Sequence, residues 1–124
     1  MPYEVYKVIH IFGILMLFTS LGGVALHGIN GGDRESLGGA RKLAAASHGV
    51  AMFLILFGGF GLMARLGISH SDLAGWVIAK LGIWVLLGGA IAVLLRKPQL
   101  SKVMWFLLPA IGGVAAWIAV TKPF

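Results

Sequence analysis

Lys80 lies in the middle of the apolar stretch formed by residues 76–84, where a charged side chain is unusual and calls for an explanation. An ionisable group inside a membrane span costs about 2.5–3.5 kcal/mol on insertion scales, so it normally faces the bundle interior and a partner. His10 and His48 lie in two other apolar stretches. An amine and two imidazoles can ligate a metal centre, hold an anion or transfer protons, so these three residues form the candidate site.

The composition excludes an ordinary water-soluble domain. Apolar residues make up 59% of the 124 residues and charged residues 11%, with a mean hydropathy of +0.95. Four continuous apolar runs, at about residues 3–26, 43–66, 73–95 and 103–120, each approach the ~20 residues that cross a bilayer as a helix. The runs lack the alternation of membrane strands. With short connections, the chain is predicted to be one all-α domain, residues 1–124, folded as an antiparallel up-down-up-down four-helix transmembrane bundle.

Two further expectations concern the ends of these runs. We interpret the first run as a retained span, because its apolar core is too long for a signal peptide and no clear cleavage site follows it. Ser71 or Asp72 is expected to cap the third helix.

The residue inventory limits the chemistry of any site. Cysteine is absent, which excludes disulfides, iron–sulfur clusters and thiolate metal sites. Only four carboxylates occur, all at or outside the ends of the predicted spans, so a carboxylate-based hydrolase site is absent from the spans. The methionines are dispersed and indicate packing rather than a copper site. A metal or cofactor would therefore be held by His, Met, Lys or carboxylate.

The net charge of +6 would suggest a nucleic-acid partner in a soluble protein, but here the basic residues flank the spans. Their ordinary task is to orient the chain in a lipid bilayer, so we expect no nucleic-acid partner. Three of them, Lys7, Arg65 and Lys122, lie on the side of the termini, and six lie on the other side: Arg34, Arg41, Lys42, Arg96, Lys97 and Lys102. This asymmetry predicts a multi-pass membrane protein with the loops at residues 34–42 and 96–102 in the cytoplasm and both termini outside.

Each predicted span also carries a Gly-Gly pair. Small residues let membrane helices approach closely, which is the simpler interpretation. The alternative is that the missing side chains leave room for a flat cofactor against the backbone. The pairs are Gly22-Gly23, Gly58-Gly59, Gly88-Gly89 and Gly112-Gly113.

The positions of the ionisable residues predict their depths, because the helices alternate in direction. At ~1.5 Å per residue, His10 and Lys80 both lie about 6–8 Å from the midplane toward the outside. His48 lies about 9 Å toward the cytoplasm, some 15 Å from the His10 level. His10 and Lys80 can therefore share one layer, whereas His10 and His48 cannot ligate the same metal ion.

Alternatives remain open for each residue. His10 is either a buried histidine hydrogen-bonded between helices or an axial ligand of haem. Lys80 is a second ligand, a partner for a haem propionate, a proton donor that would make it the catalytic residue, or a side chain that snorkels to the membrane surface. For His48 we expect a hydrogen bond between helices, with a second cofactor or a proton relay as the alternative.

Three short segments carry a resemblance to a known family. Lys-Val-Ile-His at residues 7–10, Gly-Trp-Val-Ile-Ala-Lys-Leu at residues 75–81 and Val-Thr-Lys-Pro-Phe at residues 120–124 resemble segments of the small membrane-bound bacterial protoporphyrinogen IX oxidases. The resemblance is that of a distant relative. It implies a helical membrane protein with bound haem b and a functionally required His and Lys, which match His10 and Lys80.

The sequence therefore favours a haem b-binding membrane redox protein, with oxidation of a porphyrinogen as the implied enzymatic activity. Two other classes of function stay open. One is a non-catalytic accessory or assembly subunit, working in a larger membrane complex or as a homo-oligomer. The other is a small transporter or channel that uses Lys80 and the histidines along its pathway.

Overall fold

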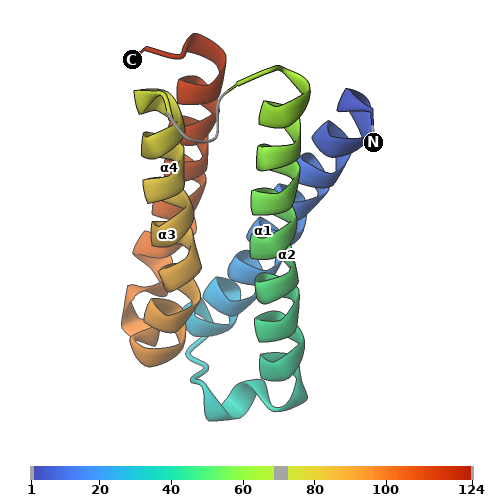
Figure 1. Cartoon of the computed structure of the whole chain (residues 1–124). Helices are drawn as coiled ribbons and strands as arrows, with labels where there is room; N and C mark the ends of the chain where they lie inside the picture. Colours follow the sequence, from blue (N-terminus) through green and yellow to red (C-terminus); the bar gives the residue numbers. More distant parts are fainter. Residues whose placement is uncertain (1, 69–72, 124) are drawn as a thin grey trace.

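The computed structural model describes residues 2–68 and 73–123, and these residues form helices and short connections without a strand (Figure 1). Four long α-helices run along the chain, joined in part by two 3-10 turns. The elements are α1 (Tyr3–Ile29), η1 (Glu35–Leu37), α2 (Gly39–Arg65), α3 (Gly75–Arg96), η2 (Pro98–Leu100) and α4 (Ser101–Thr121). The predicted all-α four-helix bundle is confirmed.

Three of the four long helices, α1, α2 and α4, are longer than the apolar runs that predict them, whereas α3 begins two residues later than its run. α1 continues to Ile29, and α2 already begins at Gly39, so that Arg41 and Lys42 lie in its first turn. A helix can carry charges where it leaves the apolar layer, because long basic side chains reach the membrane surface. Gly38 precedes α2 with a φ of +57°, a left-handed conformation that glycine adopts without steric cost. The predicted cap by Ser71 or Asp72 lies outside the described residues.

All four long helices have the length and hydropathy of membrane spans. Many of their large apolar side chains are exposed in the isolated chain, among them Val8, Phe106 and Val120 at 65%, 71% and 80%. In a multi-pass membrane protein such side chains contact lipid rather than water. The chain is therefore a multi-pass membrane protein whose outer surface is in contact with the bilayer.

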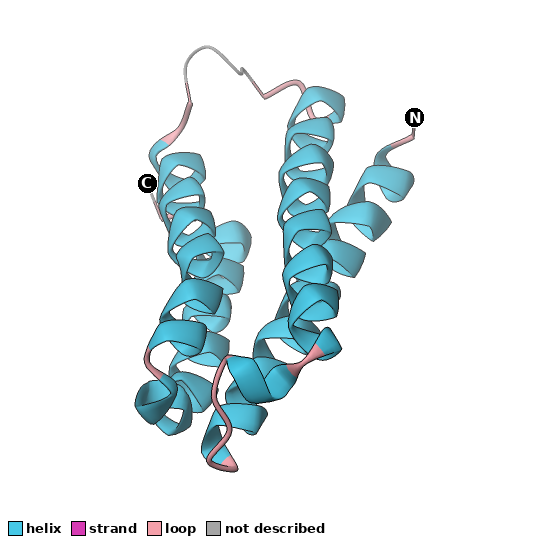
Figure 2. Ribbon diagram, turned by 90° about the horizontal axis from the view of Figure 1, so that it is seen from below, coloured by secondary structure: helices cyan, strands magenta, loops and turns pink. Residues whose placement is uncertain are grey.

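α1 packs most extensively against α2, and α3 lies beside α4 (Figures 1 and 2). α4 contacts α1 as extensively as it contacts α3, and α1 also touches α3. α2 and α3 touch at few positions although they follow one another in the chain. Both termini lie at the end of the bundle where α2 stops and α3 starts (Figure 1). η1 and η2 lie at the opposite end.

The main apolar core occupies the half of the bundle near η1 and η2. Leu17 and Leu21 of α1 are 1% and 0% exposed, and they belong to the same buried cluster as Leu87, Leu94 and Leu108. His10 and Lys80 lie in the other half, toward the termini. The polar candidate residues are thus separated from the best-packed apolar layer.

The closest approach between α1 and α2 occurs at Gly58. A Cβ atom added there would lie 2.7 Å from the backbone nitrogen of His10 and 2.8 Å from its Cα. Such distances are shorter than normal contacts, so only glycine allows the two backbones to approach this closely. The simpler interpretation of the glycine pairs is confirmed here, while a Cβ at Gly22 or Gly23 would meet nothing within 4 Å.

We expect Gly58→Ala to destabilise the bundle by about 1–3 kcal/mol, because the new methyl group meets the backbone of α1 rather than a movable side chain. The matched control on the same helix is Gly49→Ala, where a Cβ meets nothing within 4 Å. Removing a flexible glycine there should be neutral or stabilising by up to about 1 kcal/mol. Thermal unfolding in detergent measures both, and equal melting temperatures for the two variants would contradict the close approach at Gly58.

Candidate functional site

His10 is oriented by a hydrogen bond between helices. Its Nδ1 lies 2.8 Å from the carbonyl oxygen of Ile55 on α2, and the side chain is half-buried. Because a carbonyl oxygen only accepts hydrogen bonds, Nδ1 is the nitrogen that carries the proton and donates it. The neutral ring then keeps a free lone pair on Nε2.

The Nε2 atom of His10 is available to a ligand. It has no hydrogen-bond partner within residues 2–68 and 73–123. It is also not one of the fully buried polar atoms in these residues that lack a partner, so a ligand can reach it. A hydrogen bond from one ring nitrogen to a backbone carbonyl is the usual way in which a metal-binding histidine is held. The hydrogen bond expected for a buried histidine is therefore present, and the same bond leaves Nε2 suited to act as a ligand.

Lys80 lies on the side of α3 that faces the other helices. Leu87 and Leu94 follow it at successive seven-residue intervals, which place all three residues on one face, and they are 7% and 2% exposed. Lys80 itself is half-buried, and its ammonium forms no hydrogen bond or ion pair with any described residue. This face of α3 thus presents one unpaired charge.

His10 is the eighth residue of α1 and Lys80 the sixth residue of α3, and both helices begin at the same end of the bundle (Figure 1). The two residues therefore lie in the same half of the bundle. They come from α1 and α3, helices that contact each other directly. The bundle therefore places an imidazole with a free lone pair near an unpaired amine.

His48 lies in a different layer. It is ten residues before Gly58 on α2, and Gly58 packs against His10, so the two histidines are separated by about 15 Å along the helix. Its Nε2 lies 3.2 Å from the carbonyl oxygen of Leu87 on α3, and the side chain is 7% exposed. The expected hydrogen bond between helices is present, and His48 does not join His10 and Lys80.

Two contacts near the candidate site were not expected from the sequence. The indole nitrogen of Trp84 donates to the carbonyl oxygen of Met52, 3.0 Å away on α2. The ammonium of Lys122 lies 5.3 Å from the centre of the Trp76 ring, a cation–π contact between the end of α4 and the start of α3. A signal for the second contact was available, because antiparallel neighbours place the end of one helix level with the start of the other.

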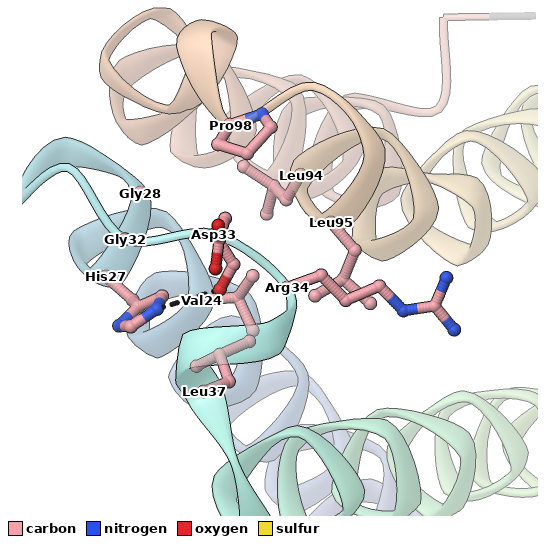
Figure 3. Close-up of a pocket in the computed structure, with 10 residues that line it drawn as sticks. All are labelled: Val24, His27, Gly28, Gly32, Asp33, Arg34, Leu37, Leu94, Leu95 and Pro98. Atoms are coloured by element: carbon pink, nitrogen blue, oxygen red, sulfur yellow. Dashed lines mark hydrogen bonds between the residues drawn. The ribbon is translucent and has the colours of Figure 1, made fainter.

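The connection between α1 and α2 forms a small pocket with a polar rim (Figure 3). The Nε2 atom of His27 lies 3.0 Å from the carbonyl oxygen of Asp33 and 2.8 Å from the hydroxyl of Ser36. The cavity is about 10 Å³, which is room for a single water molecule. It is too small for a cofactor, and these contacts hold the connection in shape.

A wider depression of about 340 Å³ opens between α1 and α2 and is lined mainly by aromatic rings. The ring of Tyr6 packs against that of Phe57, with 5.7 Å between their centres. The depression contains neither His10 nor Lys80. It is an apolar surface suited to contact with lipid.

A site for a bare metal ion is not formed by the part of the chain that the structure describes. No three side chains of His, Cys, Asp or Glu come together there. Metal ions held by protein alone normally need three or four such ligands. A haem iron differs, because the porphyrin fills four coordination positions and one histidine is enough on the protein side.

Comparison of the chain with models of protein families, with curated proteins and with solved structures finds no match. The chemistry of the site is therefore inferred from its own residues and their arrangement.

Outside the spans, the pKa of the Asp33 carboxyl lies below its ordinary value, because the backbone N–H and then the hydroxyl of Ser36 donate hydrogen bonds to it. A lowered pKa means that the ionised form stabilises the connection. This stabilisation is complete above about pH 3.9, the ordinary pKa of aspartate, and is lost as the pH falls through the lower value in the folded protein.

We therefore expect Ser36→Ala to raise the pKa of Asp33 toward its ordinary value, since one of the two donors is removed. Ser20→Ala is the control, because the hydroxyl of Ser20 bonds to the carbonyl of Leu17 within α1. Titration of the Asp33 carboxyl carbon by NMR measures the change. An unchanged pKa in Ser36→Ala would show that the Ser36 hydroxyl does not stabilise the carboxylate.

Proposed function

We propose that the protein is a haem b-binding redox protein of the bacterial inner membrane, with His10 as an axial ligand and Lys80 as the partner of a haem carboxylate. The observation that carries the proposal is the state of His10, whose Nδ1 is engaged by the Ile55 carbonyl while Nε2 is free. Haem supplies one-electron transfer when it is bound. The resemblance to protoporphyrinogen IX oxidases makes a porphyrinogen the substrate that we propose for such chemistry.

The role of His10 follows from its hydrogen bond. A backbone carbonyl that accepts from Nδ1 fixes the ring orientation and increases the basicity of Nε2. The backbone of His10 packs on Gly58, and its ring lies over Gly59, whose Cβ would be 3.4 Å from Cε1. α2 therefore holds the imidazole in one orientation without covering Nε2.

The role of Lys80 follows from its lack of a partner. An ammonium within a membrane span costs free energy unless an anion or a strong hydrogen-bond acceptor stabilises it. No described residue supplies either group. A propionate of haem would pair with the ammonium and offset that cost.

The orientation in the membrane is also part of the proposal. The two ends of the bundle differ in their number of basic residues. Without Lys80, which lies inside a span, three basic residues lie at the end with the termini and six at the end with η1 and η2. The positive-inside rule then places η1 and η2 in the cytoplasm. His10 and Lys80 lie nearer the outer surface in this orientation.

We expect His10→Ala to lose the axial ligand, so that the purified protein shows a weakened or shifted Soret band and no low-spin alpha band after reduction. His48→Ala is the matched control, because it removes an imidazole of the same size from a different layer. Absorption spectra of the oxidised and dithionite-reduced proteins test both. A native protein without Soret absorption after haem addition would contradict the proposal and favour an accessory subunit or a transporter.

We expect both Lys80→Met and Lys80→Arg to weaken haem binding, by about tenfold for the loss of one charge-assisted hydrogen bond in Lys80→Met. Lys80→Met should also stabilise the protein without haem, since it removes an unpaired charge. If Lys80 only snorkels to the surface, Lys80→Arg is silent, because a guanidinium reaches the surface equally well. Haem titrations and thermal unfolding without haem distinguish the two roles.

We expect cysteines introduced as Asp33→Cys and Gln99→Cys to react from the cytoplasmic side, and Glu4→Cys to react from outside. The native chain has no cysteine, so it gives no background. Labelling with a membrane-impermeant maleimide in cells and in inverted vesicles measures the sidedness. External labelling at residues 33 and 99 would reverse the proposed orientation.

A further inference from the structure

A second lysine lies beside the candidate site. Lys122 follows α4, and its ammonium packs over the Trp76 ring at 5.3 Å while it donates to the carbonyl oxygen of Ala119 at 3.2 Å. Trp76 is one helical turn before Lys80 on α3. Lys80 therefore lies at the same end of the bundle as Lys122.

The backbone conformation and the contacts of Lys122 orient its side chain at the end of α4. Its backbone adopts a left-handed conformation with φ of +46°, which costs free energy for a residue with a side chain. Its N–H closes the last turn of α4 by donating to Ile118 at 2.8 Å. The helix end, the aromatic ring and the carbonyl together hold the ammonium toward α3.

Within residues 2–68 and 73–123, no carboxylate forms an ion pair with Lys80 or Lys122. Lys80 is half-buried and Lys122 is exposed just beyond the end of α4. Like charges at the edge of an apolar layer repel each other. A ligand that brings two negative groups would remove this repulsion and gain two charge-assisted hydrogen bonds.

We propose that Lys80 and Lys122 form a two-cation site that selects a planar apolar ligand carrying two carboxylates on one edge. This inference rests on the proposed function and deepens it, because the ligand that meets this description is a tetrapyrrole with two propionates. The ring of Trp76 contacts Lys122 and lies one helical turn before Lys80, so it would supply an apolar surface beside the carboxylates. Lys122 is a positioning and specificity residue in this arrangement.

Metal-free protoporphyrin IX tests the two-cation site without involving axial ligation by His10. We expect it to quench the tryptophan fluorescence of the protein in lipid nanodiscs, and to bind about tenfold or more tightly than its dimethyl ester, which lacks both charges. Lys122→Gln and Lys80→Gln should each weaken binding of the diacid by about five- to twentyfold. Neither substitution should change binding of the ester.

The control is Lys102→Gln, the same change at an exposed lysine in the first turn of α4, at the opposite end of the helix. It should leave the affinity for the diacid unchanged. Equal affinities of the native protein for diacid and ester would overturn the two-cation site, as would native affinity for the diacid in Lys122→Gln. The proposed function fails separately, if the native protein binds the metal-free diacid but gives no His10-dependent haem spectrum.

Discussion

The approach of α1 to α2 at Gly58 is the contact on which the candidate site depends. Lipid tails are as apolar as leucine, so helices in a membrane associate through close packing and hydrogen bonds rather than through the hydrophobic effect. Gly58 allows the backbone of His10 to lie directly against α2. At that distance the imidazole reaches the Ile55 carbonyl, and the same contact decides both how the helices pair and which ring nitrogen remains free.

A bilayer interior offers no water to satisfy side-chain donors, and the bundle uses backbone carbonyls instead. The carbonyls of Ile55, Met52 and Leu87 each accept a hydrogen bond from a side chain on another helix. Carbonyl oxygens have two lone pairs, so they can do this while they keep their bonds within the helix. His10, Trp84 and His48 are satisfied in this way, which makes the unpaired ammonium of Lys80 an exception that requires its own explanation.

The four helices could be predicted from the sequence because long apolar runs identify membrane spans. Their exact ends could not, because a helix can extend beyond its apolar run, as α2 does at its start, where it includes Arg41. His10 and Lys80 were identifiable because polar side chains are rare within membrane spans. Their hydrogen-bond partners were not, since the Ile55 carbonyl has no signature in its side chain. The contact of Lys122 with Trp76 could have been anticipated, because consecutive spans run antiparallel and place the end of α4 level with the start of α3.

The two halves of the bundle differ in how well they are packed, and this difference bears on ligand binding. The core around Leu21 and Leu94 lies near η1 and η2. α2 and α3 make few contacts with each other. Lys80 and Lys122 lie toward the termini, and neither forms an ion pair with a residue that the structure describes. A ligand that binds only the folded bundle adds its binding free energy to the stability. An anionic ligand in this half would supply charge where the described residues lack it, so the lysines that destabilise the bundle would also contribute to the affinity for such a ligand.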